Sequence, residues 1–133
     1  MLTILKDLHA EALAATAALA ALVDGPPPPR ATLSAARRRL GEAAAGLTRC
    51  LERQVYPELL DTLPPDQANR VRVLQGSAAG FRALASTYMT VWPTDKALAS
   101  WNQYRSASRA MQGRIRQRIE AEAALLYPLL GGP

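Results

Sequence analysis

The chain has 133 residues, of which 49% are hydrophobic, 5% are aromatic and 20% are charged, and its formal net charge is +5. This length allows one domain with a sizeable core, and the apolar content excludes a disordered polymer. Few aromatic side chains and abundant alanine favour close-packed helices over a β-sandwich. The single cysteine, Cys50, excludes an internal disulfide framework and indicates a reducing compartment, so we expect a cytoplasmic protein.

The first predicted helix covers residues 3–23 and ends where Gly25 and four prolines form a stiff linker over residues 25–30. Its apolar stretch, residues 12–23, is too short to span a bilayer, and the acidic residues before it do not fit a signal peptide. We therefore expect no membrane partner. The helical period predicts that it buries Leu5, His9, Ala12, Thr16, Leu19 and Val23.

The second predicted helix covers residues 32–60, with Pro57 near its end, and a turn follows at residues 62–66. The third covers residues 66–91. Apolar steps of three and four predict two buried seams, namely Leu33, Ala36, Leu40, Ala44, Leu47, Leu51 and Val55 on the second helix, and Val71, Leu74, Ala78, Phe81, Ala85 and Tyr88 on the third.

The fourth predicted helix covers residues 94–127, with Thr94 as its N-cap and Asp95 in its first turn. Pro128 and the Gly-Gly-Pro tail should stop it. Its predicted seam is Trp101, Tyr104, Ser108, Met111, Ile115, Arg118, Glu122 and Leu125. Four such helices with short connections predict an all-α, up-and-down antiparallel four-helix bundle that forms a single domain over residues 1–133.

The net positive charge raises the question of a nucleic-acid partner. The basic residues gather in two places, the cluster Arg37, Arg38 and Arg39, and a stripe on the fourth predicted helix formed by Arg105, Arg109, Gln112 and Arg116. Solvated helix surfaces account for both, and no recognition motif or interleaved aromatic residue accompanies them. We therefore expect no nucleic-acid partner.

Two predicted helices end in a similar pattern, LERQVYP at 51–57 and EAALLYP at 122–128. The chain thereby resembles the hemerythrin-like (HHE cation-binding) family, whose second and fourth helices each carry His-x-x-x-Glu shortly before Leu-Tyr-Pro. The segment LKDLH at 5–9 is similar to the histidine motif of the family's first helix. Residues 81–92, with Trp101 and Tyr104, resemble the region between the third and fourth helices of bacterial members. The resemblance covers essentially the whole chain and implies the same bundle.

The resemblance also implies a di-iron site, which needs about five histidines and two bridging carboxylates on facing helices. This chain has one histidine. Of the family's ligand positions, His9 and Glu122 are retained, whereas Leu47, Leu51 and Arg118 replace the others on the second and fourth helices. We therefore expect no metal site and no cofactor. The alternative is residual iron held by His9 and Glu122.

The replacements suggest what stands at this site instead. Leu47 and Leu51 lie on the apolar seam and should fill the former metal cavity on one side. Arg118 lies one turn before Glu122, so we expect an ion pair that forms a structural polar centre with His9. The simplest interpretation of the neighbouring residues is a buried, apolar role for Cys50 and packing roles for Tyr56 and Tyr127, with their hydroxyls near water.

A second resemblance covers residues 72–79, RVLQGSAA. The segment is similar to the active segment of histidine phosphotransfer domains, which are also four-helix bundles. Arg72 stands at the phospho-accepting histidine and Gln75 at the lysine, so the chain cannot perform phosphotransfer at this site. This alternative implies a pseudo-phosphotransfer regulatory domain.

We expect no enzyme and no catalytic residues, because no nucleophile with a base, no phosphate loop and no matched inward carboxylate pair is evident. The predicted function is that of a hemerythrin-like bundle without its di-iron site, which acts through protein–protein contacts in regulation or signalling, as an adaptor or a homodimer. One alternative is a residual metal-binding or oxygen-related role of His9 and Glu122. Another is a small-molecule pocket in the bundle core, since an alanine-rich interior need not pack perfectly.

Overall fold

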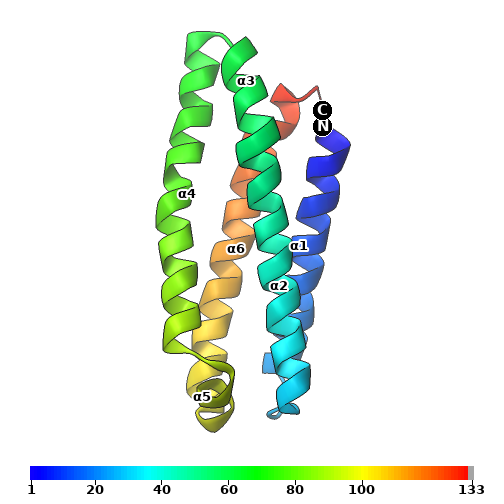
Figure 1. The fold of residues 1–133 in the computed structure, drawn as a ribbon, viewed down its shortest axis with the longest axis vertical. Coiled ribbons are helices and arrows are strands. Elements are labelled where there is room, and N and C mark those ends of the chain that lie inside the picture. The colour runs from blue at the N-terminus through cyan, green and yellow to red at the C-terminus, as the bar shows by residue number, and fades with distance from the viewer. Residues whose placement is uncertain (132–133) are drawn as a thin grey trace.

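The computed structural model describes residues 1–131 and shows an all-α protein, with no strand in that range. The helices are α1 (Leu2–Val23), α2 (Arg30–Cys50), α3 (Tyr56–Thr62), α4 (Pro65–Val91), α5 (Thr94–Ala99) and α6 (Trp101–Leu129), and a π-helical segment, η1 (Leu51–Val55), joins α2 to α3. Figure 1 shows α1, the continuous α2–η1–α3 stretch, α4 and α6 running side by side along the long axis, with both termini at one end. Within these residues, no helix combines the length and apolar character needed to cross a membrane.

The predicted helix over residues 94–127 is wrong as a single helix. Ser100 has φ −128° and ψ 53°, which lies outside the helical region and separates α5 from α6. Pro93 rather than Thr94 is the N-cap of α5, and no side chain caps this helix, while Asp95 lies in its first turn as predicted. Pro128 does not stop α6, because a proline in the last turn removes only one hydrogen bond. The helix ends at Leu129, before Gly131 at φ 94°, and the rest of the predicted tail lies outside the described residues.

The π-helical segment η1 has a cause in the sequence. Pro57 has no backbone N–H and its ring would meet the carbonyl four residues earlier, so the turn before it widens. The N–H of Tyr56 accordingly donates to the carbonyl of Leu51, five residues back. Wide turns of this kind re-aim side chains and are frequent at functional sites. Here the widened turn helps to direct Leu51, Glu52 and Tyr56 toward the interior cavity described below.

The predicted buried seam of α1 is confirmed at all of its residues. On α2 the seam is interrupted, because Ala44 is exposed while Leu33 and Leu47 are buried. The predicted seam of α6 is buried at four of its residues, Trp101, Tyr104, Ser108 and Glu122, and partly buried at the other four. Gln112 is buried as well, so the predicted solvated stripe is wrong at that residue. In α4 only Ala68 and Val71 are buried, near its N-terminal end. The remainder of α4 therefore covers the interior only loosely.

The core consists of two apolar clusters. One lies toward the α3 end and includes Leu5, Leu51, Val55, Tyr56 and Leu126, and the other lies toward α5 and includes Leu19, Leu33, Ala97, Trp101 and Tyr104. The α5 end is also joined by polar contacts, because the Arg105 guanidinium donates to the carbonyls of Val23 (2.5 Å) and Gly25 (3.0 Å). Trp101 donates to the same glycine carbonyl at 2.9 Å. These bonds satisfy carbonyls at the C-terminal end of α1 that have no partner within that helix.

Candidate functional site

The predicted polar centre forms between α1 and α6. His9 Nε2 lies 2.8 Å from Glu122 Oε1, and Arg118 Nε donates to Glu122 Oε2 at 2.9 Å. The side chains of His9 and Glu122 are each 3% exposed, and that of Arg118 is 13% exposed. The predicted i, i+4 pair is therefore confirmed, and His9 joins it.

Proton positions at this centre follow from the acceptors. A carboxylate accepts hydrogen bonds only, so His9 Nε2 carries the proton that is donated to Glu122. In the neutral histidine, Nδ1 is then an acceptor, and it lies 2.5 Å from the Tyr127 hydroxyl, which donates to it. Burial raises the pKa of Tyr127, and the Glu122 carboxylate adds to the rise, so the hydroxyl keeps its proton near neutral pH. The prediction from the sequence was a packing role for Tyr127 with its hydroxyl near water, and it did not include this hydrogen bond.

Arg118 also connects α6 to α4. Its Nη2 donates to the carbonyl of Leu74 at 2.9 Å, and its Nη1 donates to the Ser77 hydroxyl. Ser77 in turn donates to the Leu74 carbonyl, so the guanidinium and the hydroxyl share one acceptor. The centre thus links α1, α6 and α4 through one chain of hydrogen bonds. The pseudo-phosphotransfer positions, Arg72 and Gln75, are both exposed and take no part in it.

This donor set does not fit the di-iron site that the hemerythrin-like resemblance implies. The two retained ligand residues, His9 and Glu122, bond to each other, and the second carboxylate oxygen is bonded to a cation, Arg118. Across residues 1–131, no three or more His, Cys, Asp or Glu side chains lie close enough together to hold an ion. Cys50 is buried, as predicted, and burial raises the pKa of its thiol.

Tyr56 differs from its predicted role. It was expected to place its hydroxyl near water, but the side chain is fully buried and its hydroxyl has no hydrogen-bond partner. Burial raises the pKa of Tyr56 to about 12, and the Glu122 carboxylate adds to the rise. The widened turn of η1 explains the difference, since it directs the residue after it inward. This proline effect is the only signal in the sequence that could have indicated it.

A cavity of about 200 Å³ lies next to the polar centre. Its walls come from all the long helices, and most of its lining is apolar, including Leu40, Leu47, Leu51, Phe81, Ala85, Met111, Ile115 and Ile119. Leu47 and Leu51, which were predicted to fill the former metal cavity, are buried but only border this space. These two leucines therefore form one side of the space, as predicted, and do not fill it completely.

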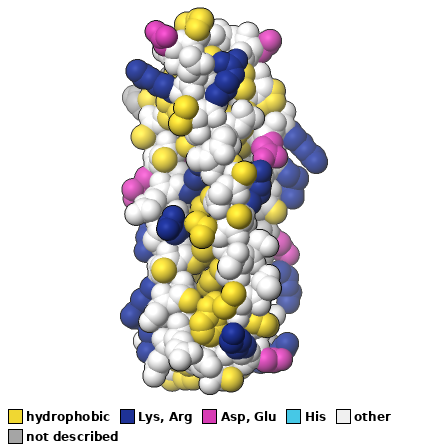
Figure 2. All heavy atoms as spheres, turned by 90° about the vertical axis from the view of Figure 1, so that its left-hand side faces the viewer, with side chains coloured by type: hydrophobic (Ala, Val, Ile, Leu, Met, Phe, Trp, Pro, Cys, Tyr) yellow, Lys and Arg dark blue, Asp and Glu magenta, His cyan; other side chains and the backbone are white. Residues whose placement is uncertain are grey.

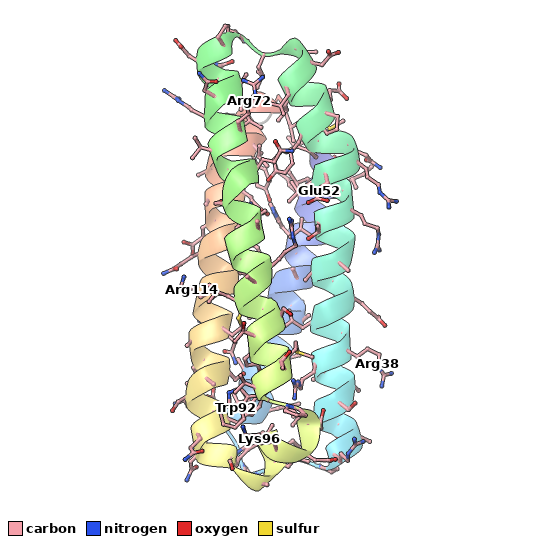
Figure 3. All side chains as sticks on the ribbon, turned by 60° about the vertical axis from the view of Figure 1, so that its left-hand side comes forward. Arg38, Glu52, Arg72, Trp92, Lys96 and Arg114 are labelled. Atoms are coloured by element: carbon pink, nitrogen blue, oxygen red, sulfur yellow. The ribbon has the colours of Figure 1, made fainter. Side chains whose placement is uncertain are left out.

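The cavity opens as a cleft between α2 and α4, because α4 packs against α3 and α6 and not closely against α2. Exposed residues of α2, η1 and α4 form its rim, namely Gly41, Ala44, Glu52, Arg82 and Met89. Glu52 and Arg82 form an ion pair across the rim at 2.9 Å. Figure 3 shows Glu52 on the side of its segment that faces α4. Seen from the side of α4, apolar side chains form a column along the lower half of the molecule (Figure 2).

The two ends of the cleft carry polar groups. One end holds Tyr56, Arg118 and Glu122 of the polar centre, and the other holds Arg37. Arg37 was predicted to be part of a solvated basic cluster, but it is buried, while Arg38 and Arg39 are exposed as predicted. The helical period placed Arg37 one turn from Leu33 and Leu40, and that position was the available signal.

No protein-family model matches the chain, and no curated protein or solved structure matches it significantly. The hemerythrin-like resemblance therefore stays a prediction based on the motifs at residues 5–9, 51–57 and 122–128.

Proposed function

We propose that the protein is a non-catalytic binding protein, a hemerythrin-like up-and-down four-helix bundle that has lost its di-iron site and holds a small apolar molecule in the cleft between α2 and α4. The observation that carries this proposal is the apolar cavity of about 200 Å³ beside the replaced ligand positions Leu47, Leu51 and Arg118. The descent from a metal-binding bundle rests on the sequence motifs alone.

The size and chemistry of the cleft support binding. An apolar cavity of roughly 150 Å³ is large enough to hold benzene, so a space of this size has room for a small apolar molecule. Most ligand pockets are similarly apolar, with a few polar groups that fix orientation. A ligand would remove from water the exposed edges of Phe81, Ala85 and Met111, which the helices themselves leave only partly covered.

The polar centre supports a role without catalysis. His9 and Arg118 each bond to Glu122, and within residues 1–131 no nucleophile other than the Tyr127 hydroxyl bonds to His9. Tyr127 does not line the cleft, so this chain of hydrogen bonds does not reach a bound molecule through its hydroxyl. A centre arranged in this way holds helices together, and we infer no reaction at it.

A neutral probe tests binding directly. We expect decanol to bind with one-to-one stoichiometry. Calorimetry, or the fluorescence of Trp92 and Trp101, measures this binding. Ala85 lines the cleft and Ala83 is exposed outside it, so Ala85→Phe and Ala83→Phe are a matched pair. Ala85→Phe should weaken decanol binding by about tenfold or more, and Ala83→Phe by less than about twofold. Equal binding by both variants, or no saturable binding to the parent protein, would overturn the proposal.

The predicted role in protein–protein contacts remains a second candidate, and one observation favours it. Val73, Leu84 and Val91 are 75%, 43% and 44% exposed. At about 100° per residue they fall within roughly 20° of one another around α4, so all three face outward from the same side of the helix. A second copy of the chain is the partner that we propose for it. Light scattering should then show a dimer that Leu84→Glu converts to a monomer, and a monomeric parent protein would exclude this candidate.

A further inference from the structure

Arg37 is the buried cation that the fold does not explain. Its side chain starts on α2 and reaches across the cleft, because its guanidinium contacts Met89 and Tyr88 of α4 and Tyr104 of α6. The residue is 7% exposed, so more than nine-tenths of it is buried. An arginine keeps its charge in proteins, and it therefore brings a full positive charge into an apolar space.

The partners of this guanidinium are weak. Its Nη2 donates to the thioether sulfur of Met89 at 3.3 Å, and its carbon lies 5.7 Å and 5.6 Å from the ring centroids of Tyr88 and Tyr104. Nε and Nη1 are buried and have no hydrogen-bond partner. Among residues 1–131, no ion pair includes Arg37. A thioether is a poor acceptor, so a buried cation here lacks the anion that usually accompanies one.

A carboxylate would supply what is missing. It accepts two parallel N–H bonds from one edge of a guanidinium, in the geometry that arginine favours. Met89 is half exposed and unbranched at its thioether, so it can turn away from Nη2 toward solvent. The aromatic rings would remain as a platform that holds the guanidinium in place. The apolar part of the same molecule would then lie along Leu40, Leu47 and Ile115, which line the cleft beyond Arg37.

We propose that the ligand of the cleft is an apolar carboxylate, such as a medium-chain fatty acid, whose carboxylate binds Arg37 in place of the Met89 thioether. This inference rests on the proposed binding function and adds the chemical class of the ligand. It also explains why an unpaired cation lies at one end of an apolar cleft, away from the internally paired centre at Arg118.

The test compares two probes of equal chain length, decanoate and decanol, at one pH and salt concentration. Decanoate should bind the parent protein more tightly than decanol does. Arg37→Met should lower the affinity for decanoate by about tenfold to a hundredfold and change the affinity for decanol by less than about twofold. Arg114→Met removes the same charge from an exposed position that points away from the molecule in Figure 3, and it should leave both affinities unchanged. Circular dichroism verifies that each variant is folded.

Met89→Ala provides a second variant, which leaves Arg37 itself unchanged. It removes the acceptor that competes for Nη2, and it should therefore raise the affinity for decanoate by a few-fold without raising that for decanol. If decanol binds as tightly as decanoate and Arg37→Met leaves their ratio unchanged, the carboxylate inference is wrong and the binding function stands. If neither probe binds, the proposed function fails as well.

Discussion

The polar centre makes a specific prediction about stability, which the variant Glu122→Leu tests. Its carboxylate accepts one hydrogen bond from His9 at 2.8 Å and one from Arg118 at 2.9 Å, and its side chain is 3% exposed. The substitution therefore leaves a guanidinium and an imidazole N–H without their shared acceptor. Leucine is similar in size, so the loss of the charge and its bonds dominates the effect.

The magnitude follows from what each partner retains. Breaking a buried ion pair by removing one member costs about 3–5 kcal/mol. Arg118 keeps its bonds to Leu74 and Ser77 and is 13% exposed, so the cost should lie at the lower end. We expect Glu122→Leu to lower the free energy of unfolding by about 3 kcal/mol. Glu120→Leu changes an exposed residue of the same helix and should stay within about 0.5 kcal/mol of the parent.

Urea unfolding followed by circular dichroism gives these free energies, and the double variant Arg118→Met with Glu122→Leu decides the interpretation. It removes the ion pair as a unit but leaves the His9 N–H without an acceptor, so it should still cost about 2 kcal/mol. A double variant that is as stable as the parent, or more stable, with an unchanged fold would show that the centre has no structural necessity. Buried ion pairs in other proteins have been replaced by apolar residues with that result.

Two further predictions concern single residues. Tyr56→Phe removes a buried hydroxyl that has no partner, so the free energy of unfolding at pH 7 should rise by about 1 kcal/mol. Because burial raises the pKa of Tyr56 from 10.0 to about 12, the folded parent protein holds this proton more tightly than the unfolded chain does, so the parent loses stability as the pH rises from 10 toward 12. The free energy of unfolding, measured in urea at pH 7 and near pH 11, should fall less between these two pH values in Tyr56→Phe than in the parent protein. An equal fall in the two proteins would contradict the reasoning. Arg105→Met removes the donors to the Val23 and Gly25 carbonyls and should lower the melting temperature, with a cost of about 1–2 kcal/mol, whereas the exposed Arg109→Met should change little. Equal effects of these two substitutions would exclude a capping role for Arg105.

Local patterns were sufficient for much of the secondary structure. The proline and glycine positions predicted the bounds of α1 and α4 to within one residue, and the apolar period predicted every buried residue of α1 except Ala15. The spacing of Arg118 and Glu122 predicted their ion pair, since an i, i+4 separation brings two helix residues together whatever surrounds them. The break at Ser100 was missed because a serine between two helical stretches has no strong preference of its own.

The sequence by itself therefore determined the features that depend on neighbours a few residues away, namely the bounds of α1 and α4, the apolar face of α1, and the residues that share one helical turn. Only the tertiary structure decided how far α4 stands from α2, and with it the cleft and the burial of Arg37. It also decided the hydrogen bond from Tyr127 to His9, which joins α6 to α1. The physical reason is that the helical period specifies a direction around one axis and not the distance between two axes. That distance depends on side-chain packing between segments far apart in the chain, and the small residues Ala78 and Ala85 that line the cleft do not fill the space between the helices.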